Sequence, residues 1–228
     1  MILRTFIMLA VSATFLTAQT ESKNIKLRAA ALGIVNEQDT LWAGNGPGKE
    51  ATPIRLNTRT FGPEVEVRST AGKLVLYLER KDAEAASPPP AAVSVTFAGE
   101  RGLLIFAPEQ ERYRAFMMPD DETSAGDFVL FNLAQQPLAW SFDGNQAEVI
   151  TAGGRAIHHT PGGISTAVKI VMKQPDGSLK VIRNTVWQMG GSQREFVFVY
   201  GTPNAPKFHH LIASEPLKPA DGTKEPRN

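Results

Sequence analysis

Short runs of alternating apolar and polar residues, separated by turn residues, occupy most of the chain. In PLAWSFDG (137–144), Leu138, Trp140 and Phe142 fall on one face of an extended strand, and the residues between them fall on the other. In REFVFVYG (194–201), aromatic rings share one face and valines the other, so we expect both faces to be covered. No long stretch keeps the helical spacing of apolar residues free of glycine and proline, so the pattern predicts strands.

The clearest strand candidates are 74–79, 92–97, 102–108, 127–133, 137–144, 166–173, 179–187 and 194–201. Asp143-Gly144 and Pro175-Asp176-Gly177 predict tight turns between neighbouring strands. With the weaker runs included, roughly fifteen strands are expected, which is too many for one simple sandwich. The expected fold class is therefore all-β, with two immunoglobulin-like antiparallel β-sandwich domains after an N-terminal signal peptide.

The domain boundaries follow from changes in composition along the chain. The segment MPDDETSAGD (118–127) is polar, acidic and without apolar alternation, so we expect a solvated linker there. It separates a first β-sandwich domain over 25–118 from a second over 126–214. The last residues, 215–228, have almost no apolar content and predict a disordered tail.

The first eighteen residues have the order of a secretory signal peptide. One basic residue, Arg4, precedes an apolar run from Phe6 to Leu16, and the small residues Thr17 and Ala18 follow. The apolar run is short for a membrane span, although an uncleaved anchor stays open as an alternative. We expect a periplasmic or secreted protein with no membrane span after signal removal.

Charge and cysteine content exclude several classes of function. The 228 residues carry a formal net charge of +1, and their few basic clusters are flanked by acids. Nucleic-acid binding needs clustered lysine and arginine, so a nucleic-acid partner is not expected. The chain contains no cysteine, which excludes cysteine catalysis and leaves an exported protein without disulfides.

All four histidines occur in two doublets, RAIHHTPG and KFHHLI, which hold His158-His159 and His209-His210. Successive side chains of a strand point to opposite faces, so each doublet offers one ring to any shared site. If the two strands paired, His159 and His210, or His158 and His209, could supply two metal ligands. Zinc normally takes three or four protein ligands, and no further ligand has a recognisable spacing. We therefore expect no metal and no cofactor, with His159 and His210 as the remaining metal candidates.

Other motifs for chemistry are missing or incomplete. Neither GGISTA (162–167) nor MGGSQRE (189–195) is a nucleophile elbow, and GNGPG (44–48) lacks the end of a phosphate-binding loop. The acidic run Asp120 to Glu122 lacks the alternation of a calcium loop and is interpreted as part of the linker. We therefore expect no catalytic residues.

Tryptophan is the last candidate for ligand binding. Trp140 alternates with apolar neighbours and is expected in the core, whereas Trp42 stands beside the glycine-rich loop. We expect Trp42 to be exposed and able to stack on a ligand such as a sugar.

The second half, from GDFVLFNLAQQPLAWSFDG to REFVFVYGTP, resembles uncharacterised exported bacterial β-sandwich proteins. The shared pattern is a strand with Asn132 near its end, a short turn, and a strand that ends at Gly144. The resemblance covers about half of the chain and implies a fold and a compartment, without catalytic residues. In its size, its expected export and its expected division into two β-sandwich halves, the chain is also similar to periplasmic pilus-assembly chaperones. That family's cleft Arg and Lys pair has no clear counterpart in this sequence.

These observations favour an exported non-enzymatic envelope protein that binds protein or glycan partners through sandwich edges and loops. Two alternatives remain open. One is a hydrolase or metal-dependent enzyme with its site at the domain junction, and the other is a periplasmic assembly chaperone.

Overall fold

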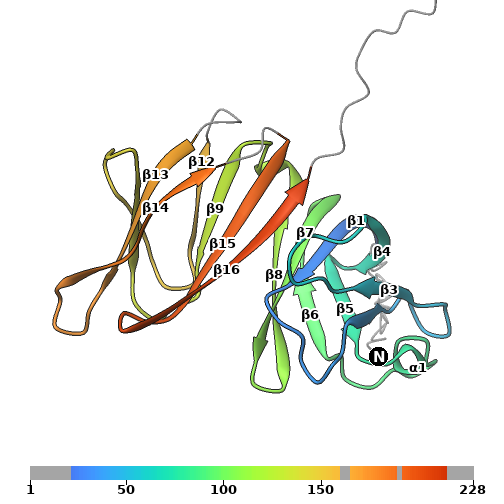
Figure 1. Ribbon diagram of the computed structural model, residues 1–228. Helices are drawn as coiled ribbons and strands as arrows, with labels where there is room; N and C mark the ends of the chain where they lie inside the picture. Colours follow the sequence, from blue (N-terminus) through green and yellow to red (C-terminus); the bar gives the residue numbers. More distant parts are fainter. Residues whose placement is uncertain (1–21, 160–164, 189–191, 215–228) are drawn as a thin grey trace, which may run out of the picture.

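A computed structural model describes residues 22–159, 165–188 and 192–214, and these residues are almost entirely β-structure. In these described ranges, sixteen strands and two very short helices follow one another (Figure 1). The all-β class is confirmed, and each clear strand candidate of the sequence coincides with a strand. The expected signal peptide (1–18) and tail (215–228) lie outside the described residues.

The first eight strands form one sheet, sheet A, with the order β3-β2-β5-β4-β1-β7-β8 and with β6 beside β5. Its strands are β1 (Ser22–Ala31), β2 (Thr40–Ala43), β3 (Thr52–Arg55), β4 (Val65–Thr70), β5 (Lys73–Tyr77), β6 (Val93–Thr96), β7 (Arg101–Glu109) and β8 (Arg112–Pro119). The short helix α1 (Arg80–Ala83) lies between β5 and β6. Strands β1 and β7 pair in parallel, and the other pairs are antiparallel.

The remaining strands form two four-stranded sheets after a short 3-10 helix, η1 (Asp120–Glu122). Sheet B has the order β12-β9-β15-β16 and contains β9 (Asp127–Asn132), β12 (Arg155–His159), β15 (Gln193–Thr202) and β16 (Ala205–Ser214). Sheet C has the order β11-β10-β13-β14 and contains β10 (Leu138–Phe142), β11 (Glu148–Ile150), β13 (Ser165–Lys173) and β14 (Leu179–Gln188).

The change of sheet falls between β8 and β9, within the polar segment 118–127. The division of the chain into independently folding domains at this point stays a prediction. The turn signals are in place, since Asp143 and Gly144 have φ values of 49° and 78° between β10 and β11. Gly177, between β13 and β14, also has a positive φ. These left-handed conformations suit tight hairpin turns.

Three apolar clusters hold the sheets together. The first lies within sheet A and includes residues of β1, β2, β4, β5 and β7. The second lies between sheets B and C and includes the buried Trp140, Phe142 and Trp187. The third lies between sheet B and the β1-β7-β8 part of sheet A, and we call it the seam. Figure 1 shows the seam as the place where β15 and β16 face β7 and β8.

Sheet B is the central layer because both of its faces are covered. On β15, Phe196 and Phe198 pack in the seam, whereas Val197 and Val199 pack against sheet C. All four side chains are 0% exposed, which confirms the expectation from the sequence that both faces of this strand are covered. A strand that is buried on both sides has no polar face, so the run reads as continuously apolar.

The acidic run beside the seam differs from the expected solvated linker. Asp120 forms an ion pair with Arg194, whose side chain is 2% exposed, at 2.8 Å between Oδ1 and Nη1. The same Nη1 donates to the Asp120 carbonyl oxygen and to Thr123 Oγ1. Glu122 pairs with Arg155 at the start of β12. The segment therefore anchors sheet A to sheet B, because a buried guanidinium is costly unless its charge is paired.

Candidate functional site

The outer face of sheet C, which points away from sheet B, carries an apolar row across all four strands. The registers place Val149 of β11 opposite Ala139 of β10, Ala139 opposite Val171 of β13, and Val171 opposite Val181 of β14. Val149 is 67% exposed and Val181 is 47% exposed. We call these four residues the outer row.

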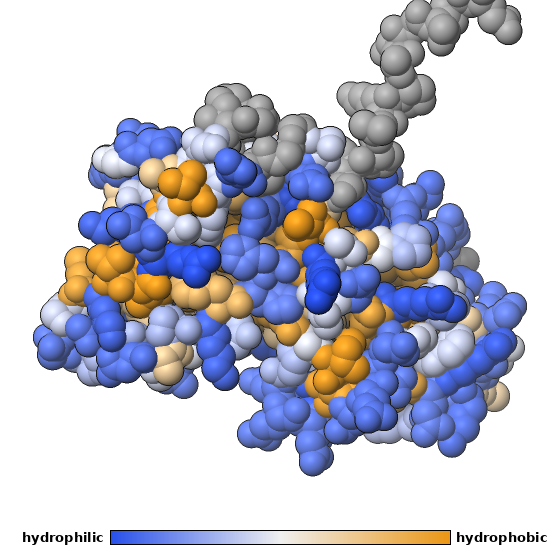
Figure 2. Space-filling model, viewed as in Figure 1, coloured by the Kyte–Doolittle hydropathy of each residue, from blue (hydrophilic) through white to orange (hydrophobic). Residues whose placement is uncertain are grey.

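Further exposed apolar side chains flank the outer row on β14. Leu179 and Val186 are 68% and 60% exposed, respectively. Figure 2 shows apolar side chains gathered over β13 and β14 at this end of the molecule. Large exposed aliphatic residues that adjoin one another on a sheet are characteristic of interaction surfaces, whereas scattered single ones need no explanation.

A local irregularity explains why β14 exposes so many apolar side chains. The register between β13 and β14 shifts between Ile170 and Val171, so Ile182 has no direct partner. Ile182 packs partly against the inner cluster, while Val181 faces outward beside Val171. A β-bulge of this kind re-aims side chains along one strand.

Two long edge strands of the second half differ in how they are covered. The edge of β16 is closed by the chain at Arg59–Phe61: Phe61 N donates to the Ile212 carbonyl, and Ile212 N donates to the Arg59 carbonyl. Strand β14, ten residues long, is the edge of sheet C. Within the described residues, no backbone hydrogen bond reaches its outer side from another segment.

The outward face of β13 carries two lysines, and the acid Asp143 lies beside Ala167 at the end of β10. The outward positions of the sheet C strands include Lys169 and Lys173, both exposed, and no aspartate or glutamate faces outward between them. An open edge with unpaired N–H and C=O groups can accept an added strand, and the outer row can pack against apolar side chains beside it. The surface therefore suits a partner that combines apolar and acidic residues.

The histidines of β12 lie on opposite faces of sheet B, as strand alternation predicts. The ring of His158 stacks on Phe142 of sheet C with centroids 3.5 Å apart and an interplanar angle of 2°. His159 Nδ1 lies 2.9 Å from Oδ1 of the buried Asp127 on the other face. Burial lowers the pKa of His158 below its ordinary value of 6.5, because desolvation disfavours the charged ring.

The histidines of β16 also divide between the two faces. His210 contacts Trp187 of sheet C edge to face and pairs with Glu195 through Nδ1. His209 Nε2 lies 2.8 Å from the Thr58 carbonyl oxygen, on the side of the first half. Each ring therefore has a partner that fixes its place in the packing.

The structure does not bring the two metal candidates together. Strands β12 and β16 are the opposite edges of sheet B, so His159 and His210 lie on different edges as well as different faces. In the part of the chain that the structure describes, no group of three or more histidines and carboxylates could hold a metal ion.

Trp42 is partly buried in a small satellite cluster with Tyr77 and Ala83. The Arg80 guanidinium lies over its ring, with Cζ 5.6 Å from the centroid. A sugar that stacks on this face would have to displace Arg80. Sugar stacking by Trp42 stays a prediction.

Sequence reasoning did not identify the outer row as a site. A signal was present in Val149, Val181 and Val186, which are β-branched residues on short strands. The outward position of Val181 depends on the register shift of β14, which the alternation of apolar residues does not reveal.

Comparisons with known proteins give little information. No protein family and no curated protein matches the chain. Among solved structures, the membrane pore complex of pneumolysin is similar with a TM-score of 0.32 and 9% identity, over 73% of this chain and 44% of that chain. The chain thus spans less than half of that protein, and a TM-score this low does not establish a common fold. Within the described residues, no helix is both long and apolar enough to cross a membrane.

Proposed function

We propose that the chain is an exported, non-enzymatic envelope protein that binds a protein partner through the outer face of sheet C and the open edge of β14. The observation that carries this proposal is the outer row, which continues across four strands and ends at an uncovered edge. The partner supplies an extended segment with apolar side chains over Val149 and Val181, and acidic side chains beside Lys169 and Lys173. Main-chain hydrogen bonds to β14 add affinity, and the side chains set the choice of partner.

A second copy of the chain is a poorer occupant of this surface. A two-fold contact over β14 brings Lys180, Arg183 and the sheet lysines of both copies to one interface, without an acid on β14 to compensate. Like charges opposite one another on paired strands are destabilising. A heterologous partner with acidic residues avoids this repulsion.

The finer fold and compartment expectations belong to the same proposal. The halves form two immunoglobulin-like domains, a signal peptide directs export, and the protein acts in the periplasm or outside the cell. Support for two domains comes from the separate clusters within sheet A and between sheets B and C. The likeness of the second half to uncharacterised exported bacterial β-sandwich proteins is compatible with this compartment.

Site-specific photocrosslinking in the producing cell tests the binding surface. A photoreactive residue at Val149 or Val181 is expected to capture one defined protein. The same residue at Leu78, which is 46% exposed on the first half, is the matched control. The proposal would be refuted if all three positions captured the same protein, or if neither sheet C position captured any protein. Capture of a second copy of the chain would identify a homodimer instead.

The competing functions have separate tests. Stoichiometric zinc or copper in the purified protein, lost in the variants His159→Ala and His210→Ala, would support a metal-dependent enzyme. Specific signals on a glycan array would support a glycan partner. A captured partner that is a pilus-type subunit would point to an assembly chaperone.

A further inference from the structure

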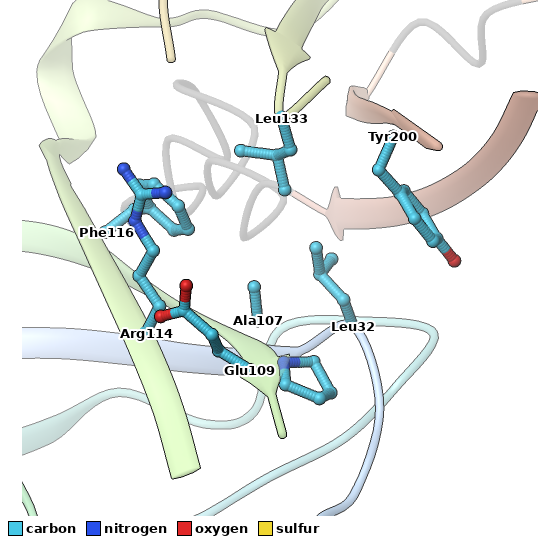
Figure 3. Close-up of a pocket in the computed structure, with 8 residues that line it drawn as sticks. Leu32, Ala107, Glu109, Arg114, Phe116, Leu133 and Tyr200 are labelled. Carbon is cyan, nitrogen blue, oxygen red and sulfur yellow. The ribbon is translucent and has the colours of Figure 1, made fainter. Parts of the chain in front are cut away.

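A pocket of about 270 Å³ opens where the β7-β8 hairpin emerges from the seam (Figure 3). On β7, Leu103 and Ile105 are fully buried in the seam, and Ala107 and Glu109 continue the same face beyond it. Side chains of one strand share a face at every second residue, so the apolar row of the seam ends in a charged residue at the pocket.

The pocket has an aromatic and aliphatic lining. Phe116 and Arg114 of β8 pair with Ile105 and Ala107 of β7, and the Arg114 guanidinium lies 4.9 Å from the centre of the Phe116 ring. Figure 3 shows Leu32 and Leu133 pointing into the space opposite Phe116, with Tyr200 beyond them. Leu32 follows β1, and Leu133 and Tyr200 lie at the ends of β9 and β15, so both halves of the chain contribute.

No ion pair joins either charged residue of the lining to another described residue, although Arg112 of β8 stands directly opposite Glu109. Within the described part of the chain, the guanidinium of Arg114 makes only the contact with the Phe116 ring, and the Glu109 carboxylate forms no ion pair or hydrogen bond. They are diagonal neighbours across the hairpin, a spacing of about 7–8 Å between Cα atoms. An unpaired cation and an unpaired anion therefore face the mouth of one apolar pocket.

We propose that this pocket binds a small zwitterion with an apolar body, of the class of α-amino acids with an aliphatic side chain. The carboxylate of the ligand pairs with Arg114, its ammonium pairs with Glu109, and its side chain enters the space between Phe116, Leu32 and Leu133. A ligand with one charge leaves the other side chain unpaired. The volume is below the roughly 300–1,000 Å³ of pockets for drug-sized ligands, as expected for a smaller molecule.

This inference goes beyond the proposed function, because the pocket is formed by sheets A and B and shares no residue with the outer row. The two proposals can fail separately. Arg114 and Glu109 are both exposed, so each ion pair contributes little and the expected dissociation constant is on the order of 1 mM.

Nuclear magnetic resonance of the leucine methyl groups of the full chain tests the pocket. Leucine, 4-methylpentanoate and 3-methylbutylamine share the same branched body and differ in their charges. Leucine is expected to shift the methyl signals of Leu32 and Leu133 saturably, and the singly charged analogues are expected to bind about three- to fivefold more weakly. No saturable shift with leucine up to about 50 mM, or equal binding of all three compounds, overturns the proposal.

Charge variants assign the two contacts. Arg114→Gln is expected to weaken the binding of leucine about three- to fivefold and to leave the affinity for 3-methylbutylamine unchanged. Glu109→Gln is expected to weaken the binding of leucine and to leave the affinity for 4-methylpentanoate unchanged. Arg55→Gln makes the same charge change at an exposed position of β3, outside this pocket, and is expected to have no effect on leucine binding. If Arg55→Gln weakens leucine binding as much as Arg114→Gln, the assignment of the pocket is wrong.

Discussion

The seam and the outer face of sheet C are both apolar surfaces of β-sheets, but only the seam is covered. Phe196, Phe198 and Ile105 in the seam are 0% exposed, whereas Val149 and Val181 in the outer row are 67% and 47% exposed. The seam contributes to the stability of the fold because its side chains have left water, at about 25 cal/mol per Å² of apolar surface. The outer row contributes less of this stabilisation, because much of the surface of Val149 and Val181 stays in water until another molecule covers it. An apolar row on a strand thus indicates a packing surface without identifying what packs on it.

Truncation of a seam residue has the largest expected effect on stability. Phe198→Ala removes a ring that stacks on Phe131, with centroids 4.8 Å apart. We expect a loss of about 3–5 kcal/mol in the free energy of unfolding, because the deletion leaves a cavity between two sheets. Chemical denaturation followed by circular dichroism measures this loss.

The matching truncation on the open surface is Val186→Ala. Val186 is 60% exposed, so its expected effect is within about 0.5 kcal/mol. If both variants lose similar stability, the outer face is already covered in the isolated protein and the contrast with the seam does not hold.

Removal of the ion pair beside the seam has the next largest expected effect on stability. Asp120→Ala leaves Arg194 buried without its carboxylate, a change that costs about 3–5 kcal/mol for fully buried pairs. We expect about 2–3 kcal/mol here, because the Asp120 side chain is 16% exposed and Thr123 Oγ1 still accepts from Arg194. Asp121→Ala, at the exposed neighbouring acid, is the control and is expected to be neutral in the same denaturation experiment. Equal losses in the two variants would argue against an anchoring role for Asp120.

The stacked histidine between sheets B and C predicts a smaller, pH-dependent effect. Burial lowers the pKa of His158 in the folded protein, so the unfolded chain binds more protons below pH 6.5. The contribution of neutral His158 is therefore complete above about pH 6.5 and is lost as the pH falls toward the lower pKa of the folded state.

His158→Phe keeps an aromatic ring against Phe142 and removes the titration. Between pH 7.5 and 5.5, the wild type is expected to lose up to roughly 1 kcal/mol more than this variant. Urea denaturation at each pH measures the difference. Parallel pH profiles of the two proteins would show that the protonation of His158 is not linked to folding.

Much of the fold could be predicted from the sequence, because strand alternation is a local property. The patterns of 137–144 and 194–201 correctly predicted the inward face of β10 and the two covered faces of β15. The separation of His158 from His159 follows from the same rule.

The remaining features depend on contacts between distant parts of the chain. The sequence could not show that β12 and β16 are opposite edges of sheet B, which decides that His159 and His210 do not meet. Nor could it show that Asp120 pairs with Arg194, 74 residues away. The outer row and the hairpin pocket depend on a register shift and on the packing of two sheets, and neither leaves a local pattern.

The double variant Val149→Lys/Val181→Lys tests the central claim, that the outer row binds a partner and does not hold the fold together. The free energy of unfolding of the variant is measured first. The mass of the isolated partner complex is then measured by size-exclusion chromatography with light scattering. We expect stability to change by less than about 1 kcal/mol and the complex to be lost. A complex that survives the two lysines, or a variant that loses several kcal/mol of stability, would contradict the claim.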